Sequence, residues 1–74
     1  MNSQNFNNKI GSQIRDAREK KDYSCQQMAD FLNCAKSTYN YYERGVYSIP
    51  IERLIKLCNY LGLDWVKVVD YANK

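Results

Sequence analysis

One face of the segment 36–44 carries side chains that could hydrogen-bond to the edges of nucleic-acid bases. At about 100° of rotation per residue, a helix that turns Tyr39 and Tyr42 inward presents a polar and basic face on its opposite side. Lysine can donate to O6 and N7 of guanine, asparagine can pair with N6 and N7 of adenine, and a tyrosine ring can contact a thymine methyl group. The candidate base-contacting residues are Lys36, Ser37, Asn40 and Tyr41. The alternative interpretation is that they form only the solvated face of a surface helix.

The elements that precede this face favour the first interpretation. Residues 24–45 read SCQQMADFLNCAKSTYNYYERG and predict two short amphipathic helices joined by a turn. Ser24 and Gln27 match the S-x-x-Q capping box that marks a helix start. The apolar positions of the first helix follow the i, i+3, i+4, i+7 spacing of one helix face, at Cys25, Met28, Ala29 and Leu32. This arrangement is typical of a helix-turn-helix.

The whole chain predicts an all-α domain of five helices. The expected helices cover residues 8–21, 25–32 and 36–44, a segment opened by Pro50 and ended by Gly62, and a short segment capped by Asp64. The apolar stripe of the fourth helix is Ile51, Leu54, Ile55, Cys58 and Leu61. Residues 1–7 are polar and rich in asparagine, so they are expected to form a disordered tail before a single domain at 8–74.

In residues and in order of elements, the chain resembles the lambda-repressor-like (Xre/Cro/repressor) helix-turn-helix family of DNA-binding transcriptional regulators. The matching segments are IGSQIRDAREKK at 10–21, YSCQQMADFL at 23–32, KSTYNYYERG at 36–45 and IERLIKLCNYLGLDW at 51–65. The resemblance implies a compact five-helix domain, and a repressor that binds a palindromic operator in double-stranded DNA as a homodimer. The third helix would then enter the major groove.

Three positions depart from the family pattern. Cys25 stands where the second helix usually has glutamine, Asn33 replaces the turn glycine, and Ala35 replaces the serine or threonine that caps the third helix. Asparagine can still adopt the left-handed conformation of such a turn. Alanine has no oxygen to cap a helix, at a typical cost of about 1 kcal/mol.

Contacts to DNA phosphates would come from residues on both sides of the third helix. The start of the second helix offers free N–H donors and the positive end of its dipole, next to Ser24 and Gln26. The candidates on the other side are Arg44, Tyr47 and Ser48. Tyr47 could equally pack onto Ile49 or Pro50.

Two further residue sets carry structural roles that the resemblance implies. Arg18 and Glu43 match an arginine and a glutamate that pair at the edge of the core and fix the angle of the third helix; the alternative is that both are exposed. Family members usually work as twofold dimers, and the candidate interface residues are Leu57, Tyr60, Val66 and Val69. Trp65 is expected to close the core.

Composition excludes several classes of function. The chain has 74 residues, a net charge of +3, three cysteines at wide spacing and no histidine, so neither a disulfide framework nor a zinc site is expected. Cys34 and Cys58 are interpreted as small core hydrophobes, whereas Cys25, at a helix start, has either a redox or a packing role. Without a signal peptide or an apolar run of about 18 residues, the protein is expected to be cytoplasmic.

The sequence also predicts that the protein is not an enzyme and takes no cofactor or small-molecule ligand. It has no histidine and no metal-ligating cluster, and a chain of 74 residues leaves no room for a substrate pocket of ordinary volume. The alternative function is a protein-interaction module of the same fold that binds a toxin, a polymerase subunit or another regulator. The tyrosines at 39, 41, 42 and 47 keep this alternative open, because tyrosine is enriched at protein interfaces.

Overall fold

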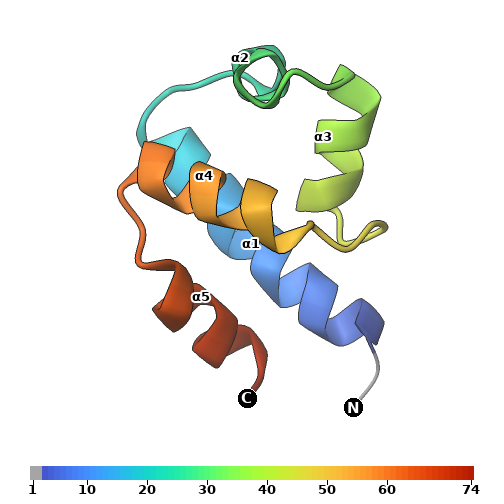
Figure 1. Cartoon of the computed structure of the whole chain (residues 1–74), viewed down its shortest axis with the longest axis vertical. Coiled ribbons are helices and arrows are strands. Elements are labelled where there is room, and N and C mark those ends of the chain that lie inside the picture. The colour runs from blue at the N-terminus through green and yellow to red at the C-terminus, as the bar shows by residue number, and fades with distance from the viewer. Residues whose placement is uncertain (1–2) are drawn as a thin grey trace.

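Three short helices pack against one long N-terminal helix, and a fourth packs on one of these three, in the computed structural model, which describes residues 3–74 (Figure 1). The helices are α1 (Ser3–Lys20), α2 (Cys25–Leu32), α3 (Lys36–Glu43), α4 (Ile51–Leu61) and α5 (Trp65–Ala72). α1 contacts α3, α4 and α5, while α2 packs mainly on α3. The described residues form no strand, and the predicted all-α fold is confirmed.

The start of α1 differs from the expectation. α1 begins at Ser3 rather than at residue 8, so residues 3–7 are helical where a disordered tail was predicted, and Met1 and Asn2 lie outside the described residues. The physical reason is that this segment has tertiary partners: the Phe6 ring packs against the core, and the Gln4 amide donates to the carbonyl oxygen of Gly45. The polar composition of the segment gave no sign of these contacts.

The start of α2 and the turn between α2 and α3 form as their residues predict. Gln27 N–H donates to Ser24 Oγ at 3.0 Å, and the Gln27 side chain accepts from Ser24 N–H at 2.7 Å, which completes the capping box. Asn33 ends α2 in the left-handed conformation, with φ 56° and ψ 47°. Ala35 begins α3 without a side-chain cap.

The core is formed by all five helices around the inner face of α1. Its buried apolar residues are Ile10, Ile14, Met28, Ala29, Leu32, Tyr39, Tyr42, Leu54, Leu57, Cys58, Leu61, Val68 and Ala72. Trp65 is half-buried and packs against this core, as do Cys25 and Cys34. Burial and the nearby Asp64 carboxylate raise the pKa of the Cys58 thiol to about 11, so this thiol stays protonated at neutral pH.

The apolar stripe of α4 corrects two predictions. Leu57 is fully buried, because positions 54, 57, 58 and 61 share one helix face at the i, i+3, i+4, i+7 spacing, and it therefore cannot belong to a dimer interface. Ile51, expected in the stripe, stands in the first turn of α4 and is 56% exposed. Within residues 3–74, no helix is long and apolar enough to cross a membrane.

Replacing Ala35 with threonine should stabilise the fold by about 1 kcal/mol, because its hydroxyl can accept from a free N–H in the first turn of α3. The backbone of Ala35 already has the extended conformation of a cap residue, with φ −69° and ψ 147°, and its side chain is exposed. Urea denaturation of Ala35→Thr should be compared with that of its isostere Ala35→Val. Equal unfolding free energies for the two variants would show that no cap forms.

Candidate nucleic-acid interface

The orientation of α3 is fixed by a buried ion pair at its C-terminal end. Arg18 of α1 donates to Glu43 through Nε at 2.6 Å and through Nη2 at 3.2 Å, so the guanidinium grips both carboxylate oxygens. Arg18 Nη1 also donates to the carbonyl oxygen of Tyr23, at 2.8 Å. The predicted pair is therefore present, and it connects α3 to α1 and to the loop before α2.

A third side chain completes this cluster from within α3. Tyr39 is fully buried, and its hydroxyl donates to Glu43 Oε2 one helical turn further on. Burial raises the pKa of Tyr39 well above its usual value, and the hydrogen bond to Glu43 raises it further. The hydrogen bond to Glu43 likewise raises the pKa of Arg18. The site thus holds a charged guanidinium and a protonated phenol, both directed at one carboxylate.

A close contact between the backbones of α1 and α3 also holds the C-terminal end of α3 in place. A Cβ atom on Gly11 of α1 would overlap the carbonyl oxygens of Tyr42 and Glu43. Only glycine allows α1 and α3 to approach this closely, so the two helices meet in one arrangement. Together with the ion pair, this contact leaves α3 little freedom to tilt.

The opposite side of α3 carries the candidate base-contacting residues together. Lys36 and Ser37 are exposed in its first turn, and Asn40 and Tyr41 are partly exposed in the next. Tyr39 and Tyr42 point into the core, as the rotation of the helix requires. The sequence-predicted residues therefore form one continuous polar face.

Arg44 and Tyr47 both contact Tyr41 at the end of this face, which the sequence did not predict. The Arg44 guanidinium carbon lies 5.9 Å from the centre of the Tyr41 ring, within the range of a cation–π contact. The Tyr47 ring meets Tyr41 edge-on, with centroids 4.9 Å apart. Tyr47 is 48% exposed, and its ring packs on Tyr41 rather than lying free in solvent.

The other candidate phosphate contacts lie on two separate segments. Ser24 and Gln26 are exposed at the start of α2, where Gln26 Nε2 donates to Asp30 at 2.9 Å. Ser48 lies in the loop between α3 and α4 and exchanges hydrogen bonds with Asn7. The two groups flank α3 along the chain. Within residues 3–74, no three metal-ligating side chains gather in one place.

Comparison with known protein families identifies the family to which this five-helix domain belongs. The helix-turn-helix family model matches residues 14–68, from the middle of α1 to the middle of α5. The chain belongs to the lambda-repressor-like helix-turn-helix family. This confirms the resemblance expected from the sequence.

Two curated relatives in this helix-turn-helix family come from phage-derived sequences. Over 55 residues the chain is 40% identical to the SPbeta prophage-derived uncharacterized HTH-type transcriptional regulator YonR of Bacillus subtilis (strain 168), covering 74% of this chain and 51% of YonR. Over 61 residues it is 33% identical to the cryptic phage CTXphi transcriptional repressor RstR of Vibrio cholerae, covering 82% of this chain and 55% of RstR. The chain thus spans about half the length of these relatives. Both are named as regulators, not enzymes.

Solved structures of the same fold include two crystal structures of the clp gene regulator ClgR from Corynebacterium glutamicum. Their TM-scores are 0.79 and 0.81 at 22% identity, with 92% of this chain covered in each case and 88% and 72% of the ClgR chains. At this identity the likeness establishes the five-helix fold alone.

Glu43→Gln should lower the free energy of unfolding by about 1–3 kcal/mol, because it leaves the buried Arg18 charge without its carboxylate. Glu52→Gln, at an exposed position in the first turn of α4, is the matched control and should change stability little. A double-mutant cycle of Glu43→Gln with Arg18→Gln, measured by chemical denaturation, gives the coupling. A coupling below about 0.5 kcal/mol would mean that the pair does not hold α3.

Proposed function

We propose that this protein is a sequence-specific regulator of transcription that inserts α3 into the major groove of double-stranded DNA. The observation that carries the proposal is a helix locked at one end by Arg18 and Glu43 and polar on its outer side. The major groove, about 12 Å wide, admits one α-helix. Helix-turn-helix proteins read base edges mainly with the first turns of the second helix of the motif.

The base contacts are assigned to the first two turns of α3. Lys36 donates to guanine, and Asn40 pairs with adenine through both ends of its amide. The Ser37 hydroxyl can donate or accept, so it tolerates guanine as well as adenine. Tyr41 reaches a thymine methyl group or a phosphate from the end of the face. These four residues set the sequence preference.

Phosphate contacts on both sides of α3 position the protein without selecting a sequence. Ser24 and Gln26, at the start of α2, lie beside free N–H groups and the positive end of the helix dipole. Arg44, Tyr47 and Ser48 bind the backbone on the other side. Because such contacts release counterions, affinity should fall steeply as the salt concentration rises.

Repression is the regulatory outcome that one of the two relatives supports. RstR is named a transcriptional repressor. A small domain bound across a promoter prevents polymerase from binding there. The chain therefore acts by binding its operator and occluding the promoter.

Lys36→Ala and Asn40→Ala should each weaken operator binding by about 1–3 kcal/mol and relax the preference at one base position. Lys56→Ala and Asn59→Ala, on the exposed side of α4, are matched controls that should bind as the parent does. The operator is obtained by selection from randomised duplex DNA, and single-base variants of it are then titrated with each protein.

The titration shows whether each residue contacts a base or a phosphate. A variant that loses affinity equally for all operators, with a smaller salt dependence, contacts a phosphate rather than a base. If selection with the parent protein yields no preferred sequence, the DNA-reading proposal fails and the protein-interaction module is favoured.

We further propose that the protein binds as a homodimer through the outer face of α5 and Tyr60. Val66 is 55% exposed, Val69 is half-buried beside it, and Tyr60 stacks on Phe31 and Tyr23 with its ring partly exposed. One domain contacts only a few base pairs, and each correct pair contributes about 1–3 kcal/mol, which is too little to select one site in a genome. A dimer reads two half-sites about 34 Å apart.

Val66→Lys should shift the protein toward monomer, because it puts a charge into the proposed interface while leaving the core intact. Val46→Lys is the matched control: it adds the same charge at a valine that is 48% exposed in the loop after α3. Sedimentation at micromolar concentration should show the parent and Val46→Lys at twice the monomer mass. A parent that stays monomeric, and binds a half-site as tightly as a full operator, would refute the dimer.

A further inference from the structure

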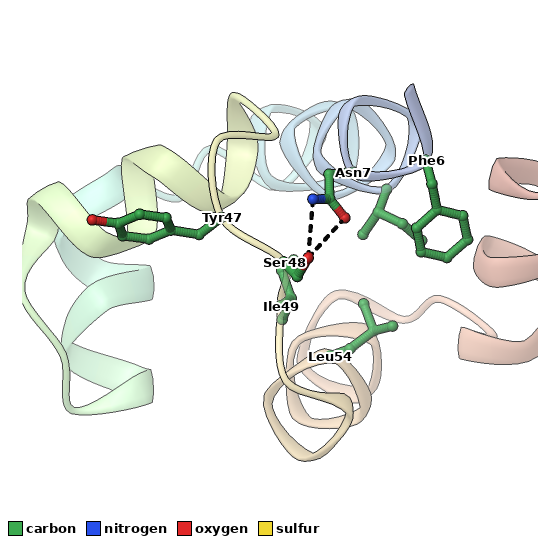
Figure 2. Close-up of a pocket in the computed structure, with 7 residues that line it drawn as sticks. Phe6, Asn7, Tyr47, Ser48, Ile49 and Leu54 are labelled. Atoms are coloured by element: carbon green, nitrogen blue, oxygen red, sulfur yellow. Dashed lines mark hydrogen bonds between the residues drawn. The ribbon is translucent and has the colours of Figure 1, made fainter. Parts of the chain in front are cut away.

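The first two turns of α1 hold the loop that follows α3. Gln4 Nε2 donates to the carbonyl oxygen of Gly45 at 2.9 Å, and Asn7 Nδ2 donates to Ser48 Oγ at 3.0 Å. Ser48 Oγ also donates to Asn7 Oδ1, at 3.3 Å, and Figure 2 shows both contacts of this pair. Residues 45–49, here called the α3–α4 loop, are thus attached to α1 at both ends.

Gly45 brings the loop directly against α1. Its φ of 74° lies in the left-handed region, and a Cβ atom there would overlap the side chain and backbone of Asn8. The loop therefore leaves α3 in contact with the segment that carries Gln4 and Asn7. This contact depends on the helical state of residues 3–8.

Apolar packing beneath the loop is incomplete. A pocket of about 140 Å³ lies between α1, the α3–α4 loop and α4, and its apolar walls include Phe6, Ile10, Ile49 and Leu54 (Figure 2). The two large apolar side chains at the tip of the loop, Val46 and Tyr47, are each 48% exposed. Backbone N–H groups of Val46 and Tyr47 donate to the carbonyl oxygen of Tyr41, at 2.9 and 3.4 Å, and hold the start of the loop to α3. With so little buried surface at its tip, the loop relies on its polar contacts with α1 to fix the direction in which it leaves α3.

The same loop carries the ring that supports the candidate DNA-binding face. Tyr47 meets the Tyr41 ring edge-on, and Tyr41 in turn faces Arg44. A continuous chain of contacts therefore runs from Gln4 and Asn7 through the loop to Tyr41. Displacement of the loop would remove Tyr47 from Tyr41 and free the Tyr41 side chain to move.

We propose that Gln4 and Asn7 are positioning residues, which hold the α3–α4 loop so that Tyr47 supports Tyr41 in its DNA-binding orientation. They act through Tyr47 and do not themselves touch DNA. The role in DNA binding rests on the function proposed above, whereas the positioning of Tyr47 is a property of the free protein. The two can therefore be tested separately.

The first test uses the free protein. Gln4→Met removes the donor but keeps the length of the side chain and its helix propensity, and Asn7→Ala removes the contact to Ser48. NMR of the parent should show nuclear Overhauser contacts between the Tyr41 and Tyr47 rings, and the double variant should lose them. Ser12→Ala, which removes only an exposed bond within α1, is the control and should keep them. Ring contacts that survive in the double variant would overturn the proposal.

The second test measures operator affinity. Gln4→Met should weaken binding about two- to tenfold, the range expected for one hydrogen bond. In a Tyr47→Ala background the same substitution should have no further effect, because Gln4 acts through Tyr47. A loss that persists in that background would mean that Gln4 contacts DNA directly and would overturn the proposal. A parent without any specific DNA site would refute the proposed function, while the NMR result would still decide whether Gln4 and Asn7 position Tyr47.

Discussion

The single carboxylate of Glu43 is the point on which the arrangement of this domain depends. It accepts hydrogen bonds from Arg18 and Tyr39, so α1 and α3 are joined to one side chain. Burial of these charges is costly in itself, and it becomes favourable only where every donor and acceptor has a partner. Within residues 3–74, no buried side-chain nitrogen or oxygen lacks a hydrogen-bond partner. The cluster therefore specifies one angle for α3 rather than simply adding stability.

Local signals in the sequence accounted for most of the fold. The capping box at Ser24, the left-handed Asn33 and the inward Tyr39 each depend on residues within one or two helical turns, and each is present in the structure. Leu57 was predicted to lie in a dimer interface but is buried in the core. The apolar residues of α4 cover a broad face of the helix, so their spacing does not show which of them point into the core. The choice between core and surface then depended on which helices pack against α4, and periodicity alone does not give that information.

The candidate site shows the same division between local and long-range information. The polar face of α3 follows from helix geometry, and the bond from Tyr39 to Glu43 has the four-residue spacing of helix neighbours, so it could have been anticipated. The contacts of Gln4 with Gly45 and of Asn7 with Ser48 join residues 41 positions apart. Asparagine and glutamine at the N-terminus have the composition of a flexible tail. Only the folded chain reveals that they have partners.

The single tryptophan gives this protein a natural optical reporter. Trp65 is the one indole in the chain, and it is half-buried at the start of α5, whereas the aromatic side chains of the α3 face and its neighbouring loop are tyrosines. α5 and α3 lie at different ends of the fold (Figure 1). Indole emission therefore follows the detachment of α5 from the core and events on its outer surface. Fluorescence of the unlabelled protein can thus separate changes at α5 from changes at the polar face of α3.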